Sequence, residues 1–243
     1  FFFTAGRMRR IDAAGVVHAY LDPATGCVAG SPVLFRGCPG LGCSAVWDAS
    51  GALFLSGNFC LGSQATAAIA RRNGDGSFTL VVGATSGATT DGTAGDLTTV
   101  SGPTALAFDS GGHLYYADPP LASVRRVDTA TGRVSTVLGV VGAIGTSGDY
   151  GPASSARTSG PESIAFDTMG NLYVTESSAY SVRMIPGTAL APTHASLELA
   201  NGGMQTVTIG RTIPTPMGAT VRDEAGDPIR GVTVHFAIDA SSV

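Results

Sequence analysis

Three aspartates at equivalent points of a recurring segment are the first residues of this sequence that could carry chemistry. Asp48, Asp109 and Asp167 each precede a glycine by three positions, in segments 46–53, 107–114 and 165–172. Carboxylates gathered in space could act as acid and base or bind calcium. Because each stands at the same point of the same segment, we expect each to bond backbone amides of its own turn. The pattern therefore predicts structural turns.

Four cysteines form a second group, and all of them fall within one stretch of the chain. Cys27, Cys38, Cys43 and Cys60 are separated by 10, 4 and 16 intervening residues. These spacings lack the short paired spacing of structural zinc sites, and they leave disulfides, free thiols and a metal site as alternatives. Three pairings are open to four cysteines, and we favour Cys38 with Cys43 and Cys27 with Cys60.

Other reactive side chains do not assemble into a recognisable site. The four histidines share no spacing, so they predict neither a metal triad nor a Ser-His-Asp set. Segment 91–96 faintly suggests a calcium loop but supplies two carboxylates, where calcium takes six to eight oxygens. The sequence thus predicts no catalytic residue, no cofactor and no metal.

The elements that must position these residues follow from the repeat itself. The three aspartates are 61 and 58 residues apart, so a unit of about sixty residues recurs. In the second unit, strands are expected at 105–108, 114–117, 124–127 and 133–138, joined by tight turns. Such a unit is a four-stranded antiparallel meander.

A signature with two arginines, or one in the last unit, recurs at the expected third strand of each unit. The signature is strongest at 124–127 and returns at 8–12, 70–73 and 182–185. A ring of such arginines could bind phosphate or acidic sugars. We expect instead that one arginine of each pair faces solvent and the other contacts Asp118 or Glu176 on the neighbouring strand.

The repeated sheets must pack against one another. A four-stranded sheet with apolar residues on both faces cannot cover itself, and stacking of such sheets is the logic of a β-propeller. The linkers repeat as well, since 91–103 and 149–161 each run twelve positions from Asp to Pro. A β-sandwich is the alternative, although sandwiches do not usually repeat their sequence at a fixed period.

At residues 148–153, 161–167, 170–174 and 182–183 the chain resembles the NHL-repeat family of β-propellers. The resemblance covers residues 1–187 and is weaker in the first unit, where Ser56 and Gly57 replace the acidic residue seen as Asp118 and Glu176. It implies a ring of six blades, of which this chain holds about three, and so a fragment of a longer protein. Related propellers include lyases, which implies a lyase or hydrolase with catalytic residues in missing blades as the alternative function.

The repeat stops after Gly187, and a different pattern follows. Residues 188–195 have the composition of a linker, and 196–243 read as alternating strands with a turn at 224–228. Segment 203–236 resembles bacterial Ig-like domains of the invasin and intimin type. The resemblance implies the N-terminal half of such a β-sandwich, acting as a spacer or adhesive module. The expected fold class is all-β throughout.

Composition limits the partners. The net charge of −4 gives no basic footprint for nucleic acid, and no apolar run reaches the roughly 18 residues needed to span a bilayer. All 14 cationic residues are arginine, which suggests a GC-rich, bacterial source. Long insertions at 22–43, 57–68, 84–102 and 140–160 are expected on one face. We expect a non-catalytic extracellular or cell-surface module that binds a protein or carbohydrate ligand on this face.

Overall fold

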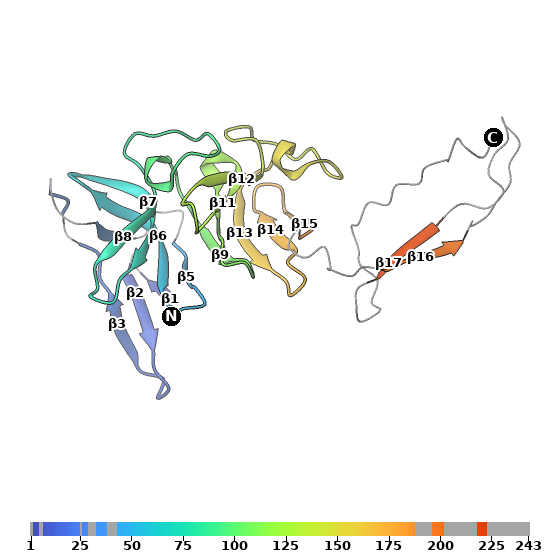
Figure 1. The fold of residues 1–243 in the computed structure, drawn as a ribbon. Helices are drawn as coiled ribbons and strands as arrows, with labels where there is room; N and C mark the ends of the chain where they lie inside the picture. Colours follow the sequence, from blue (N-terminus) through green and yellow to red (C-terminus); the bar gives the residue numbers. More distant parts are fainter. Residues whose placement is uncertain are drawn as a thin grey trace, which may run out of the picture. The chain divides into compact units, whose positions relative to one another are not determined.

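The computed structural model describes residues 2–4, 7–24, 26–28, 33–37, 43–187, 196–201 and 218–222. The protein is all-β: its strands form antiparallel sheets, with single short 3-10 turns between them (Figure 1). The chain divides into two units, Phe1–Ile185 and Pro186–Val243. Among the described residues, no helix is both long and apolar enough to cross a membrane.

Four sheets follow one another along the first unit, and we call them sheets I to IV. Sheet I contains β1 (Phe2–Thr4), β2 (Arg7–Ile11) and β3 (Val17–Leu21). Sheet II contains β4 (Leu34–Gly37), β5 (Ala45–Trp47), β6 (Leu53–Leu61), β7 (Gln64–Arg72) and β8 (Phe78–Val82). Sheet III contains β9 (Ala105–Phe108), β10 (Leu114–Asp118), β11 (Ser123–Val127) and β12 (Val134–Leu138). Sheet IV contains β13 (Pro161–Phe166), β14 (Leu172–Glu176) and β15 (Ser181–Ile185).

Sheet III is the four-stranded meander expected from the repeat, with strand order β12-β11-β10-β9. Sheet IV has the order β13-β14-β15, and sheet II has the order β4-β6-β7-β8 with β5 also paired to β6. Three 3-10 turns, η1 (Gly95–Leu97), η2 (Pro119–Leu121) and η3 (Ala153–Ser155), lie in the connections. The long linkers leave the sheets along the upper edge in Figure 1, and the tight aspartate turns lie along the lower edge.

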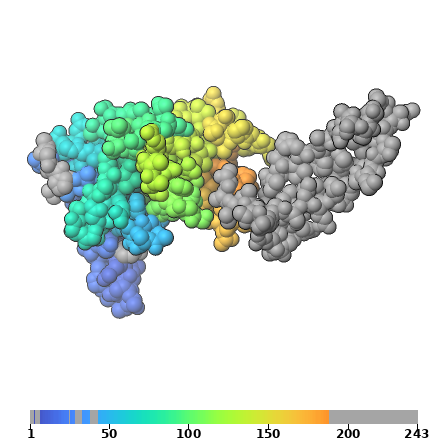
Figure 2. Space-filling view, in the orientation of Figure 1, coloured from blue at the N-terminus to red at the C-terminus, as the bar shows by residue number. Residues whose placement is uncertain are grey.

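The core lies between successive sheets, because each sheet is apolar on both faces. Ile69 and Val82 of sheet II pack with Leu114 and Val127 of sheet III, and all four are buried. Phe54 of sheet II meets Phe108 of sheet III edge to face, with ring centroids 5.1 Å apart. Burial of the apolar surface between the sheets supplies the main stabilisation of such a stack. Figure 2 shows the sheets as one continuous body from blue to orange.

The junction of sheets III and IV is built in the same way. Val124 and Leu138 pack with Ile164 and Val174. Tyr115 and Phe166 make the matching aromatic contact, with centroids 4.8 Å apart. Each sheet therefore covers the face of the next, as stacking of repeated blades requires.

Sheet II departs from the expectation in one place. Residues 57–68, expected as a loop insertion, instead lengthen β6 and β7 to nine residues each, with a turn at Gly62. Part of the first insertion also forms β4, which pairs with the end of β6 through Leu34 and Cys60. The first residues of β7 are small or polar and are not buried, so they lack the alternation of apolar and polar residues that identifies a strand. The sequence pattern therefore does not predict this hairpin.

The second unit is described only at β16 (Ser196–Asn201) and β17 (Gly218–Arg222), which pair antiparallel. The predicted Ig-like turn at 224–228, the rest of that module and the linker at 188–195 lie outside the described residues. The Ig-like assignment and the boundary at residue 187 stay predictions.

Candidate functional site

The three repeated aspartates lie in the tight turns of the lower edge. Oδ1 of Asp48 accepts hydrogen bonds from the amides of Ser50 and Ala52, at 2.9 and 2.8 Å. Oδ1 of Asp109 accepts the His113 amide at 2.8 Å. Each aspartate also exchanges backbone bonds across its turn, and the glycine three positions on has a positive φ that favours glycine.

The third aspartate repeats this arrangement. Oδ1 of Asp167 accepts the amides of Met169 and Asn171, at 2.9 and 2.8 Å. The side-chain hydrogen bond from Asn171 lowers the pKa of Asp167, and the Ser50 hydroxyl does the same for Asp48. The three carboxylates occupy separate sheets and hold their own turns, so the structure does not bring them together.

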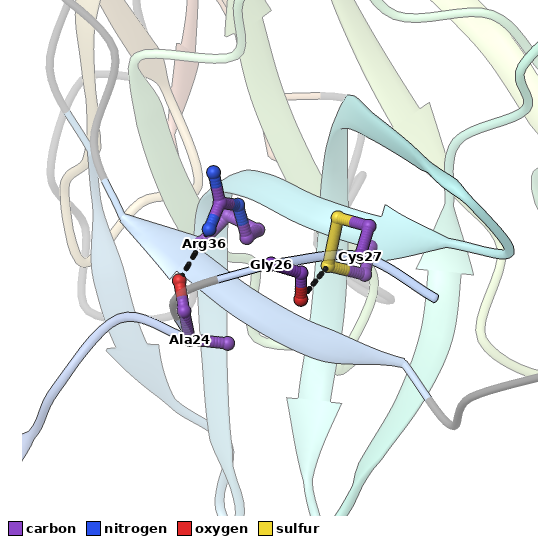
Figure 3. The surroundings of a disulfide bond; sticks show 5 residues. Ala24, Gly26, Cys27 and Arg36 are labelled. Atoms are coloured by element: carbon purple, nitrogen blue, oxygen red, sulfur yellow. Dashed lines mark hydrogen bonds between the residues drawn. A yellow bond between two sulfur atoms is a disulfide. The ribbon is translucent and has the colours of Figure 1, made fainter. Parts of the chain in front are cut away.

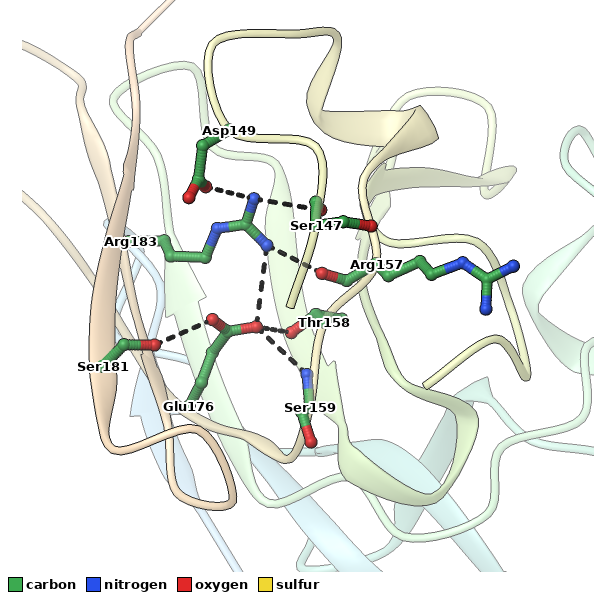
Figure 4. Close-up of polar contacts among 8 residues, drawn as sticks. All are labelled: Ser147, Asp149, Arg157, Thr158, Ser159, Glu176, Ser181 and Arg183. Atoms are coloured by element: carbon green, nitrogen blue, oxygen red, sulfur yellow. Dashed lines mark hydrogen bonds and ion pairs between the residues drawn. The ribbon is translucent and has the colours of Figure 1, made fainter. Parts of the chain in front are cut away.

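The arginine of the third strand lies on the opposite, linker-rich side in sheet IV (Figure 4). Arg183 donates to Asp149 Oδ1 at 2.5 Å and to the Arg157 carbonyl at 2.8 Å. Its Nη1 lies 3.8 Å from Glu176 Oε1. Arg183 therefore ties two points of the 149–161 linker to the sheet.

Glu176 completes this cluster from the second strand. Its Oε1 accepts the Thr158 hydroxyl and the Ser159 amide, the latter at 3.1 Å, while its Oε2 accepts the Ser181 hydroxyl at 3.0 Å (Figure 4). A buried carboxylate is stable only with such partners. The linker is thus fixed by one arginine and one carboxylate.

Sheet III contains the same cluster, 58 residues earlier. Arg125 Nη2 donates to Asp91 Oδ1 at 2.9 Å, and Asp118 accepts the amides of Ser101 and Gly102 at 2.9 and 3.1 Å. Arg125 is completely buried. We call this repeated arrangement of arginine and two carboxylates the linker latch.

The linker latch corrects the expected partner of Arg125. We expected this arginine to contact Asp118, but its hydrogen-bonded carboxylate is Asp91, 34 residues away in the linker. Asp118 instead accepts hydrogen bonds from the backbone amides of Ser101 and Gly102. Arg183 does approach Glu176, although Asp149 is its closest carboxylate.

The latch aspartates experience different environments. Burial raises the pKa of Asp91, but hydrogen bonds from Thr136 and Arg125 outweigh it and lower the pKa below its usual value. Burial dominates at Asp118 and raises its pKa, in spite of the bonds from Ser101 and Gly102. Burial has this effect because loss of solvent disfavours the charged form of a carboxyl group.

In the part of sheet II that the structure describes, a disulfide takes the place of the linker latch. The pairing of β6 with β7 places Ala70, opposite Leu55, where Arg125 stands opposite Tyr116. Gly57 takes the place of Asp118, and a Cβ there would lie 2.9 Å from Cys43 Sγ and 3.0 Å from the Gly37 carbonyl. The first insertion therefore fills the space of the missing carboxylate.

A disulfide joins Cys27 to Cys60, the pairing that the sequence favours (Figure 3). It anchors the insertion to the end of β6, and Arg36 supports the same segment by donating to the Ala24 carbonyl at 2.5 Å. Cys43 is also disulfide-bonded, whereas its favoured partner Cys38 lies outside the described residues. Among the described residues, no group of ligands could hold a metal ion.

A groove of about 450 Å³ opens beside this disulfide on the linker-rich side. One wall is the tip of the β6–β7 hairpin with Cys60, and the other is the linker that follows β8. The lining residues are Val33, Cys60, Leu61, Gly62, Leu80, Gly83, Ala84, Thr85, Ser86, Asp96 and Leu97.

The groove combines apolar surface with a few polar groups. Leu97 is 60% exposed at its rim, and Thr85 and Ser86 supply hydroxyls. Asp96 is the one ionisable side chain among the lining residues of the described structure. This chemistry suits an uncharged ligand that offers both apolar surface and hydrogen-bonding groups.

The sequence patterns predict neither the groove nor the role of the latch aspartates. In the sequence, Asp91 and Asp149 stand out only as the first residues of the repeated linker. Their equal distance from an arginine in the third strand, 34 residues in both units, is the signal that could have revealed the latch.

Comparison with known proteins supports the fold. No protein-family model matches the sequence, and no curated protein matches it significantly. A Bacteroides thetaiotaomicron protein of unknown function is similar in structure, with 20% identity and a TM-score of 0.56 over 74% of this chain and 42% of that one. An auxiliary nutrient binding protein from the same organism has 15% identity and a TM-score of 0.50, with the same coverage.

These neighbours are β-propeller-like, so the first unit has the fold of part of a β-propeller. The chain spans about two-fifths of the length of each neighbour.

Proposed function

We propose that this chain is a non-catalytic extracellular binding module, in which an NHL-repeat β-propeller presents its linker-rich face to a ligand and a bacterial Ig-like domain follows as a spacer. The observation that carries the proposal is the groove beside Cys60. Its walls are a hairpin and a linker that the disulfide and the core hold in place, and rigid walls lower the entropic cost of binding.

The ligand class that we propose is a neutral carbohydrate. The groove offers hydroxyls at Thr85 and Ser86, one carboxylate at Asp96 and apolar surface at Leu61 and Leu97. A sugar presents both hydroxyls and apolar ring faces, and so matches this mixture. One propeller-like protein is named for nutrient binding, which makes soluble glycans sensible first ligands.

The disulfide supports the extracellular assignment. Disulfides form and persist in secreted and cell-surface proteins and are rare in the cytosol. A lyase or hydrolase is the alternative implied by the sequence resemblance, and no observation on the described residues favours it.

A glycan-binding screen tests the proposal. Neutral oligosaccharides are titrated into the full chain and into a Thr85→Arg variant, whose side chain fills the groove, with binding measured by calorimetry. Thr168→Arg adds the same charge to an exposed turn on the other edge and serves as the matched control. We expect Thr85→Arg to lose binding at least tenfold and Thr168→Arg to keep it. Equal binding by both variants, or no binding by the parent chain, would contradict the proposal.

A further inference from the structure

Sheets III and IV correspond residue for residue, yet they differ in one strand. The correspondence runs without a gap from Asp91–Val127 to Asp149–Ile185, at a spacing of 58. Sheet III has β12 on the outer edge of β11, whereas β15 pairs with β14 on one edge and has no described strand on the other. Sheet III therefore shows how the free edge of sheet IV would be filled.

In sheet III, β12 is held by the linker as well as by β11. The amide and hydroxyl of Thr136 both donate to Asp91 Oδ1, at 2.9 and 2.8 Å. The Gly92 amide donates to the Val134 carbonyl at 2.8 Å, and the Val134 amide donates to the Thr93 carbonyl at 2.9 Å. The latch aspartate therefore binds the arginine of the third strand and the middle of the fourth.

The groups that hold β12 have counterparts in sheet IV. Asp149 is oriented by Arg183 at 2.5 Å and has a side chain that is 62% exposed. Tyr150 stands in the position of Gly92 and has the same left-handed backbone, with φ of +66° against +84°. Tyrosine rarely adopts this conformation, so the fold maintains the linker geometry against local strain.

The apolar face of β15 is also uncovered, because no described sheet packs against it as sheet IV packs against sheet III. Val182 is 66% exposed, whereas its counterpart Val124 is fully buried. Exposed strand edges with apolar residues readily pair with an added strand. The free edge and the uncovered apolar face therefore belong to the same strand, and Arg183 of that strand holds Asp149 of the linker beside it.

We propose that the free edge of β15 is a binding site for an extended peptide segment that adds antiparallel as a fourth strand. The segment has the pattern of β12: an apolar residue, a polar one, a serine or threonine, two apolar residues and a glycine. Its threonine would bond Asp149, and its backbone would pair with β15. The occupant that we propose is a segment of another polypeptide; among the described strands, the fourth strands β3, β8 and β12 are already paired within their own sheets.

This site lies on a sheet edge and goes beyond the proposed glycan groove of sheet II. Failure of either proposal leaves the other intact, since one is tested with oligosaccharides and the other with a peptide.

The test uses the full chain and a fluorescent synthetic peptide with the sequence of residues 131–140. Anisotropy measures binding, and hydrogen exchange locates it. We expect saturable one-to-one binding and slower exchange at the amides of β15. A peptide with Thr136→Pro lacks both donors to the carboxylate and should bind at least tenfold more weakly.

Asp149→Asn tests the carboxylate, with Asp75→Asn in an exposed turn as the matched control. We expect the Asp149 variant to weaken binding at least tenfold and the control to leave it unchanged. Circular dichroism checks that both variants fold. If Asp149→Asn fails to fold, hydrogen exchange at the amides of β15 in the unmodified chain, with and without peptide, decides the proposal. Absence of saturable binding, protection away from β15, or protection that grows with chain concentration in the absence of peptide would each overturn the proposal.

Discussion

Asp91 and Arg125 form an ion pair of 2.9 Å between a linker and the third strand of sheet III, and Asp149 and Arg183 repeat it in sheet IV at the same separation of 34 residues. The exposure of the two partners differs sharply, since the Arg125 side chain is fully buried and that of Asp91 is 52% exposed. The linker therefore covers a buried cation and supplies its counter-charge from the surface.

Removal of this counter-charge should destabilise the chain. Asp91→Ala leaves Arg125 buried and unpaired and also removes the acceptor of Thr136. We expect a loss of about 2–3 kcal/mol in the free energy of unfolding, less than for a fully buried pair because water reaches Asp91. Urea unfolding measures it, and Asp96→Ala in the same linker is the control. A loss below about 0.5 kcal/mol, the usual size of a surface effect, would show that the pair contributes little.

The same pair predicts how stability depends on pH. The pKa of Asp91 is lower in the folded than in the unfolded chain, so its contribution is complete above the unfolded value of about 3.9. It is lost as the pH falls through the folded pKa. Asp118 has the opposite effect on stability as the pH falls. Its pKa is raised in the folded chain, so protonation of Asp118 favours the folded state.

Urea midpoints between pH 6 and pH 3 test this sign. The parent chain should lose stability below about pH 4, because lowered carboxylate pKa values outnumber the raised one. The difference between the parent and Asp91→Asn should shrink over the same range. A constant difference would mean that the Asp91 charge does not contribute.

The disulfide should stabilise the chain through the denatured state. Cys27 and Cys60 close a loop with a sequence separation of 33, which corresponds to about 3.7 kcal/mol in the chain-entropy model. The double variant Cys27→Ala/Cys60→Ala should lower the free energy of unfolding by about this amount and weaken binding in the groove. Thermal unfolding monitored by circular dichroism measures the first effect. A non-reduced digest of the parent chain should contain one cross-linked peptide with both cysteines.

The sequence predicted the repeat architecture well because a sixty-residue period is a property of the residues alone. The Asp-x-x-Gly turns and the strands of sheet III follow from alternation and turn chemistry, which are local. The linker latch depends on contacts between residues 34 positions apart, and no local pattern specifies which carboxylate an arginine meets. The groove depends on β4 and the long β6–β7 hairpin, whose pairing is likewise set by tertiary contacts.

Tyr150 offers a change that should raise stability. It occupies a left-handed backbone position that Gly92 fills in the preceding repeat, and its side chain is fully exposed. Tyr150→Gly removes the clash between Cβ and the backbone that such a conformation imposes, and this gain exceeds the entropy that glycine adds to the unfolded chain. We expect an increase of about 0.5–1 kcal/mol in the free energy of unfolding.

Two further variants serve as controls. Tyr150→Ala keeps the Cβ and should gain less stability, while Gly92→Tyr should lose a similar amount of stability in sheet III. Urea unfolding of the three variants tests the order, and a Tyr150→Ala variant as stable as Tyr150→Gly would indicate that the exposed ring, not the backbone, causes the strain.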